Sequence, residues 1–199
     1  DYPYWEVCKS ADTGTGQHVA LLSKYPLEEV VFSFPNRGLY FVESDGDETD
    51  ETGISKGMKA TITIKGKKMH CFLLHLKSER GGEDSDQKRI MQAEIARRVI
   101  LPYLQKGDYV LVMGDLNSEK GHKALLTLRG FRDIYEELVQ TGDHYYFDNF
   151  DTRWTYAYKG VQEQIDHILL SLNLKHDCKN NNPKQGQMGI KSTIIETND

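Results

Sequence analysis

The residues with the clearest chemical potential are Asp115 and Asn117, which follow a short apolar run at residues 109–113. The run predicts a buried strand that ends at these two polar side chains. If the backbone there is extended, residues two positions apart lie on the same face. A carboxylate and an amide are hard oxygen donors, suited to Mg²⁺ or to a water beside a phosphate. The alternative is a strand end and turn, where Asp, Asn and Ser are common for backbone reasons.

A second group of polar residues starts at His75, near the end of an apolar run at residues 69–76. Lys77, Ser78 and Arg80 follow it. If this edge of the sheet faces a cleft, His75 can donate a strong, charge-assisted hydrogen bond to a phosphate oxygen. The alternative is a core histidine with an ordinary structural partner.

Asp166 lies just inside the apolar run at residues 165–170. An unpaired carboxylate there would be costly, so we expect Asp166 to have a partner. An acid that orients an imidazole is a recurring catalytic arrangement, and the alternative is an Asp held by backbone amides or by an arginine. The neighbouring His167 points to the opposite face and is expected to be structural.

Two arginines, Arg37 and Arg153, are weaker candidates for contact with a substrate phosphate. An arginine suits phosphate because its planar group donates two parallel hydrogen bonds. For each of them the alternative is an ordinary surface role.

These residues must be positioned by an alternation of hairpins and helices. A basic turn at residues 65–68 predicts a hairpin, and apolar residues at three- and four-residue steps predict a helix that Asp84 or Ser85 caps and that runs to about Gln105. Ser118 is expected to cap a shorter helix that Gly130 ends. The acidic segment 43–51 is expected to be a solvated loop, with a calcium or regulatory site as the alternative. Further strands are expected at residues 18–23, 30–34, 39–42, 109–113 and 190–195, and a second hairpin is expected to pair 154–158 with 165–170.

Because hairpins dominate, the pattern favours an α+β layered sandwich over a parallel doubly wound sheet. The chain has 199 residues, which suits a single domain over residues 1–199. Its net charge of −5 argues mildly against a non-specific grip on nucleic acid, although a metal ion can supply positive charge locally. The three cysteines have neither a disulfide nor a zinc spacing. No signal peptide and no run of membrane-spanning length is visible, and the cell compartment stays open.

Taken in order, four segments resemble the endonuclease/exonuclease/phosphatase family, also called the DNase I-like family. They are residues 19–26, 75–82, 114–117 and 164–171, and the resemblance runs from about Gly16 to the C-terminus. It implies a four-layer α/β/β/α sandwich with two central sheets and an active site at one sheet edge. It also implies hydrolysis of a phosphoester by in-line attack of water on phosphorus, with Mg²⁺ or Mn²⁺.

The resemblance implies a role for each candidate residue. Asp115 would orient or deprotonate the attacking water, and Asn117 would help to hold the phosphate and the metal. His75 would contact the scissile phosphate. Asp166 would pair with a histidine from a Ser-Asp-His motif, and Arg37 would match, less securely, a basic residue near the phosphate.

Two departures from the family pattern qualify this interpretation. The metal-binding Glu expected near the start and the Ser-Asp-His motif expected near the end are absent from the sequence. The expectation is therefore a domain incomplete at both ends, whose metal ligands in this chain are Asp115 and Asn117. The alternatives are a non-catalytic binding module on the same scaffold, or a chain whose missing strands another chain supplies. Nucleic acid ranks first as a substrate by family habit, with phospholipids and inositol phosphates left open.

Overall fold

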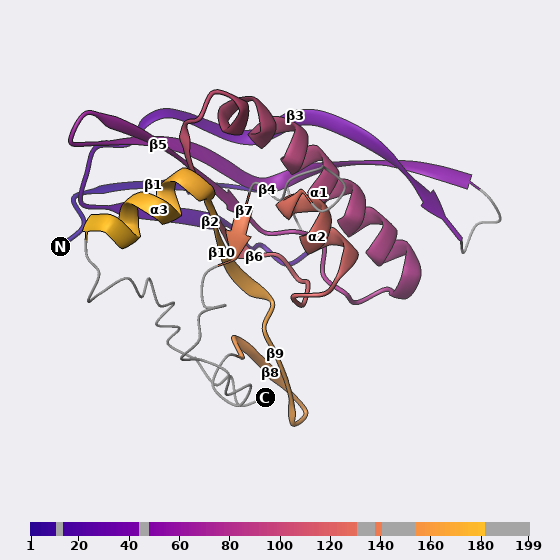
Figure 1. Ribbon diagram of the computed structural model, residues 1–199. Helices are drawn as coiled ribbons and strands as arrows, with labels where there is room; N and C mark the ends of the chain where they lie inside the picture. Colours follow the sequence, from indigo (N-terminus) through magenta and orange to yellow (C-terminus); the bar gives the residue numbers. More distant parts are fainter. Residues whose placement is uncertain (11–13, 44–47, 131–137, 141–153, 182–199) are drawn as a thin grey trace.

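The computed structural model describes residues 1–10, 14–43, 48–130, 138–140 and 154–181 (Figure 1). Three helices are present in this part of the chain: α1 (Gly82–Gln105), α2 (Lys123–Arg129) and α3 (Leu172–Asn181). The strands are β1 (Tyr4–Cys8), β2 (Val19–Ser23), β3 (Glu28–Val42), β4 (Glu48–Ile64), β5 (Lys67–Leu74), β6 (Tyr109–Asp115), β7 (Leu138–Gln140), β8 (Tyr156–Tyr158), β9 (Val161–Glu163) and β10 (Asp166–Ser171).

A six-stranded mixed sheet forms the centre of the molecule, in the order β3-β4-β5-β6-β10-β7. Within it β5 and β6 are parallel, and the other neighbours run antiparallel. A parallel pair needs a long crossover, which α1 supplies between β5 and β6. Strands β1 and β2 pair with each other, as do β8 and β9.

The two faces of the central sheet are covered by different layers. Alternate residues of a strand point to opposite faces, and along β5 Phe72 and Leu74 pack under the helices, while Cys71 and Leu73 face β1 and β2. Helices α1 and α2 therefore cover one face and the small β1–β2 sheet the other, as Figure 1 shows. The predicted class, an α+β sandwich with two stacked sheets, is confirmed.

Several local predictions are confirmed by these elements. The basic turn joins β4 to β5, with Lys65 and Gly66 at positive φ, and α1 buries Ile90, Ala93 and Ile100 as its periodicity predicts. Gly130 ends α2 in the left-handed region. The strand expected at residues 190–195 lies outside the described residues.

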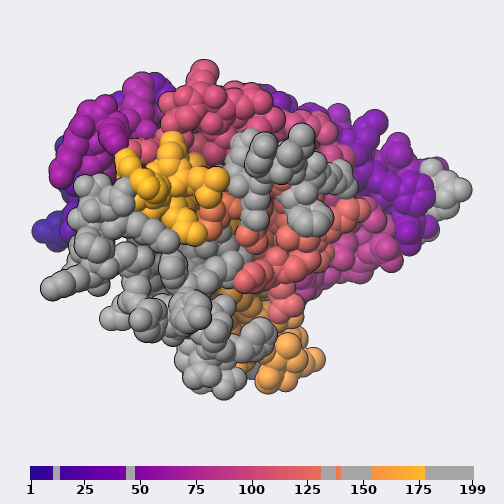
Figure 2. Space-filling model, viewed as in Figure 1, coloured from indigo at the N-terminus to yellow at the C-terminus, as the bar shows by residue number. Residues whose placement is uncertain are grey.

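The β3–β4 ribbon corrects two predictions. Residues 30–34 and 39–42 belong to one strand, β3, which bulges around Pro35 instead of ending. Residues 48–51 of the acidic segment are part of β4 and pair with β3, because backbone pairing tolerates charged side chains that stay in solvent. Residues 44–47 are outside the described part. The end of this ribbon projects beyond the helices in Figure 2.

The second predicted hairpin pairs differently from the expectation. β8 pairs with β9, which is the nearer partner across the Lys159–Gly160 turn. β10 instead joins the central sheet between β6 and β7. The run at residues 165–170 is apolar enough to be covered on both faces, so it enters the core rather than an exposed hairpin.

Both predicted helix caps are also wrong. α1 begins at Gly82 after Gly81, which has a φ of 117° and makes no side-chain cap. Ser85 lies inside the helix and donates to the carbonyl of Arg80. At α2 the capping residue is His122, whose Nδ1 accepts from the Ala124 amide, so an imidazole does what a hydroxyl was expected to do.

No helix in the described ranges is both long enough and apolar enough to cross a membrane.

A buried lysine on β4 depends on a carboxylate of β3. The Nζ atom of Lys59 lies 3.2 Å from Glu29 Oε2, and Lys68 Nζ donates to Glu29 Oε1 at 2.9 Å. These partners, with Thr61, lower the pKa of Glu29 to about 2. Since the folded state favours the ionised form, Glu29 stabilises the fold fully above the ordinary pKa of a glutamate.

We expect the stability that Glu29 contributes to be lost as the pH falls from about 4.5 towards 2. Glu29→Gln should therefore lower the melting temperature at pH 7 and flatten its dependence on pH below 4.5, as followed by circular dichroism. Glu28→Gln, at the neighbouring exposed glutamate, is the control. Parallel curves for Glu29→Gln and wild type would contradict the assignment.

Candidate active site at the edge of the mixed sheet

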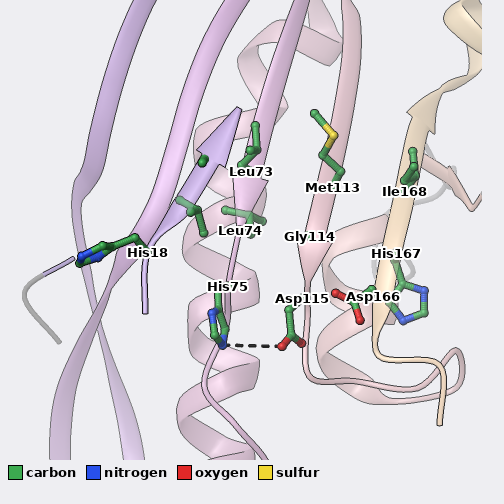
Figure 3. A pocket seen from close by; sticks show the side chains of 12 residues that line it. His18, Leu73, Leu74, His75, Met113, Gly114, Asp115, Asp166, His167 and Ile168 are labelled. Carbon is green, nitrogen blue, oxygen red and sulfur yellow. Dashed lines mark ion pairs between the residues drawn. The ribbon is translucent and has the colours of Figure 1, made fainter. Parts of the chain in front are cut away.

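The topology of the sheet brings three of the predicted residues to one edge. β5 and β6 are parallel, so their C-terminal ends lie at the same side of the sheet. His75 follows the end of β5 there, and Asp115 is the last residue of β6. β10 runs the other way, so its first residue, Asp166, lies opposite Asp115 in the ladder. Figure 3 shows these side chains gathered at that edge.

His75 and Asp115 face each other across the ends of the parallel strands. His75 Nε2 lies 3.7 Å from Asp115 Oδ2, with exposed side-chain fractions of 15% and 31% (Figure 3). Burial, followed by the charge of Asp166, raises the pKa of Asp115 from 3.8 to about 6. The ionised carboxylate is therefore poorly stabilised here, and a cation or proton bound beside it would be favoured.

Asn117 is held in a strained position next to this pair. It has a φ of 46°, its backbone amide donates to Asp115 Oδ1 at 2.9 Å, and its Nδ2 donates to the carbonyl of Leu76 at 3.0 Å. The amide group is thus fixed while its residue lines the cavity at the site. Strain of this kind persists only where the surroundings impose it, and it is common at functional sites.

A glycine makes the close approach of β5 and β6 feasible. Gly114 has a φ of 133°, and a Cβ atom there would lie 2.2 Å from the carbonyl oxygen of Leu74. The Leu76 amide donates to the carbonyl of Asp115 at 3.0 Å just beyond this point. Gly114 therefore fixes the spacing between His75 and Asp115.

Asp166 and His167 both line the smaller cavity at the site, but His167 is the more deeply buried of the two. Asp166 lines the same cavity as His75 and Asp115, and Thr155 Oγ1 accepts from its backbone amide at 3.0 Å. His167 is buried, and its Nε2 lies 2.7 Å from the carbonyl oxygen of Ser118. Burial lowers the pKa of His167, which agrees with a neutral, structural imidazole.

Two adjoining cavities meet at His75 and Asp115. One, of about 420 Å³, lies between β2 and the ends of β5, β6 and β10. The other, of about 580 Å³, extends over the loop after β5 and the β8–β9 hairpin. Its lining includes Lys77, Ser78, Glu79, Arg80, Asn117, Tyr156, Tyr158 and Glu163.

The structure does not bring Arg37 to this site. Arg37 lies on the β3–β4 ribbon, where its Nε pairs with Glu51 Oε2 at 3.0 Å. Arg153 is outside the described residues. The basic side chains that do line the larger cavity, Lys77 and Arg80, follow β5.

Sequence reasoning missed the aromatic wall of the larger cavity. The rings of Tyr156 and Tyr158 are stacked with centroids 6.4 Å apart, and the Arg80 guanidinium lies 5.8 Å from the Tyr158 ring. Alternation along a short strand places both tyrosines on one face. That signal was present in the sequence, but the incorrect partner predicted for this strand concealed it.

The donors at the site suit a loosely held divalent ion. Asp115 and Asn117 offer carboxylate and amide oxygens, but no group of three or more His, Cys, Asp or Glu side chains that could hold a metal occurs among the residues described. Mg²⁺ usually takes one or two carboxylates and completes its shell with water and substrate phosphate. The residues present fit that arrangement and do not fit an all-protein cage.

Comparison with known proteins agrees with this fold. The sequence profile of the Endonuclease/Exonuclease/phosphatase family matches residues 1–186. The chain belongs to this family, which consists of phosphoester hydrolases.

The individual proteins that match share about a third or less of their aligned residues with this chain. The chain is 31% identical over 145 residues to an inositol phosphosphingolipids phospholipase C of Saccharomyces cerevisiae, a match that covers 69% of the chain and 29% of the yeast protein. A Staphylococcus aureus beta toxin mutant with bound magnesium ions has a TM-score of 0.52 at 22% identity, over 87% of this chain and 63% of the toxin. A truncated Caenorhabditis elegans TDP2 has a TM-score of 0.53 at 15% identity, over 84% and 61%. The chain thus spans less than a third of the yeast relative and less than two thirds of either structure.

Proposed function

We propose that this chain carries the centre of a phosphoester hydrolase in which water attacks phosphorus in line with the leaving oxygen. The observation that supports it is the pairing of His75 with Asp115, 3.7 Å apart, inside cavities at the edge of the sheet. An acid and an imidazole placed together in a cavity can move a proton and neutralise charge on oxygen.

We propose for each residue the role that the family resemblance implies. Asp115 orients the attacking water and accepts its proton. His75 donates a hydrogen bond to the phosphate oxygens from the opposite side. The Nδ2 atom of Asn117 donates to the carbonyl oxygen of Leu76, and this hydrogen bond holds the side-chain amide where it can help to bind the phosphate.

Asp166 is proposed to support the site rather than to react. It lies opposite Asp115 in the strand ladder, and its negative charge disfavours ionisation of Asp115. A carboxylate in this place favours binding of a cation, or of a protonated imidazole, between the strands.

A divalent ion, Mg²⁺ or Mn²⁺, is proposed to be held by Asp115 and Asn117. When bound, it would neutralise negative charge that develops on the phosphate oxygens. The magnesium ions in the beta toxin structure lend support to this choice without fixing the metal here.

The reacting bond is proposed to be a phosphodiester. The yeast relative is named for phosphosphingolipids, which favours a lipid headgroup, whereas family habit favours nucleic acid. The stacked tyrosines beside Arg80 suit a flat group next to the phosphate, because bases stack on aromatic rings. That observation favours a nucleotide.

The test is hydrolysis of bis-p-nitrophenyl phosphate, followed by plasmid DNA and a phosphosphingolipid, with Mg²⁺ or Mn²⁺ and with a chelator. Turnover that needs the metal supports the proposal. A folded chain that binds phosphate but turns over none of these substrates would favour the binding module.

We expect His75→Ala to lower kcat for bis-p-nitrophenyl phosphate by about 100-fold, since positioned proton donors contribute about 10²–10⁴-fold. The melting temperature should change little, because the His75 backbone amide, which donates to the carbonyl of Lys56, is retained. His176→Ala, at an exposed histidine of α3, is the control. Lost stability with unchanged kcat would make His75 structural.

A further inference from the structure

A third cavity, of about 380 Å³, opens beside the candidate active site and is lined by Lys56, Lys77 and Lys88. We call it the lysine pocket. It shares His75 and Lys77 with the larger active-site cavity. A substrate whose reacting phosphate lies at His75 can therefore extend into the lysine pocket without leaving the surface.

The three lysines of this pocket come from elements far apart in the sequence. Lys56 lies on β4, Lys77 follows β5, and Lys88 is on α1. All three are half-buried. The fold thus gathers them into one concave place, unlike lysines scattered over a surface.

Two of the lysines are fixed in place by hydrogen bonds. The backbone amide of Lys77 donates to Gln92 Oε1 at 2.7 Å, and its carbonyl accepts from Arg89 Nη1 at 3.2 Å. Helix α1 therefore holds the Lys77 peptide from both sides. The Nζ atom of Lys56 donates to Thr15 Oγ1 and Gln17 Oε1, each at 3.2 Å.

Gathering these cations is electrostatically unfavourable. Burial lowers the pKa of Lys77, and the charges of Lys88, Arg89 and Lys56 lower it further. An anion bound among the ammonium groups would remove this repulsion and form charge-assisted hydrogen bonds. The arrangement occurs in a chain with a net charge of −5, so it does not follow from an excess of basic residues.

We infer that the lysine pocket binds a second phosphate group next to the one held at His75 and Asp115. The inference rests on the proposed function for its reacting phosphate and extends it to the substrate class. It selects substrates with phosphates on successive units, as in a nucleic acid strand, over substrates with a single phosphate.

The test compares binding of two thymidine dinucleotides by calorimetry, without added metal so that no turnover occurs. One carries only the internucleotide phosphate and the other has an additional 5′-phosphate. We expect the additional phosphate to tighten binding about tenfold, as one charge-assisted contact does. Lys56→Gln and Lys88→Gln should each remove most of that gain, whereas Lys106→Gln, an equal charge change at the other end of α1, should keep it.

A separate titration with inorganic phosphate alone distinguishes the source of the group. If inorganic phosphate binds and Lys88→Gln weakens that binding, while the two dinucleotides bind with equal affinity, the pocket binds free phosphate rather than a second phosphate of the substrate. The inference would be overturned if the additional 5′-phosphate added no affinity and if substitution of Lys56 and Lys88 did not change the binding of inorganic phosphate. If the lysine dependence is found in a chain that hydrolyses nothing, the phosphate pocket stands and the proposed hydrolysis fails.

Discussion

Asp115→Asn should lower kcat/KM for bis-p-nitrophenyl phosphate by about 10⁴-fold, to the level of background hydrolysis. The amide keeps the shape of the side chain, but it cannot accept the proton of the attacking water and it lacks the negative charge that strengthens binding of a divalent ion. The fold should survive, because burial and Asp166 already disfavour the charged carboxylate at this position. We therefore expect a melting temperature at pH 7 no lower than that of the wild type.

The control for this substitution is Glu48→Gln, the same loss of charge on the exposed β3–β4 ribbon. It should leave both kcat/KM and the melting temperature unchanged. Turnover close to the wild type in Asp115→Asn would remove Asp115 from the reacting centre. It would leave the lysine pocket unaffected, since that pocket is tested by binding.

Gly114→Ala should destabilise the protein by about 3 kcal/mol, the sum of left-handed strain and overpacking against a rigid backbone. The added Cβ would meet the carbonyl oxygen of Leu74 at 2.2 Å, and neither strand can move without opening the parallel pair. Urea unfolding measures the change in free energy directly. Activity should fall as well, since the same displacement separates His75 from Asp115.

Gly107→Ala separates the two contributions. Gly107 also has a positive φ, of 74°, but a Cβ there would meet nothing within 4 Å. Gly107→Ala should lower the free energy of unfolding only by the backbone strain, about 1 kcal/mol, and should leave activity unchanged. Equal losses at the two glycines would show that close approach at Gly114 is not the larger cause.

The sequence predicted those parts of the molecule that depend on local patterns. Apolar patterns located α1, β5 and β6, and the family resemblance assigned the polar residues near the ends of β5 and β6 to one active site. The resemblance implied that Asp115 acts on the attacking water and that His75 contacts the phosphate, but it implied no distance between them. The distance between them follows from Gly114, whose importance no local rule revealed.

The predictions that were wrong concern features that depend on contacts between segments far apart in the sequence. The pairing of β10 with β6 rather than with its neighbour was decided by burial on both faces of the central sheet. Arg37 is basic and near a turn, yet its strand carries it to Glu51 and away from the site. Nothing in the residues around Lys56 or Lys88 signals that β4 and α1 bring them together.

The parallel pairing of β5 and β6 also determines when the candidate centre can form. His75 and Asp115 become neighbours only after the whole crossover between Leu74 and Tyr109, including α1, has closed. Such non-local pairing is slow because loop entropy must be lost before the contacts form. During refolding, the β4–β5 hairpin should become protected from hydrogen exchange early, and catalytic competence should return only in the last kinetic phase.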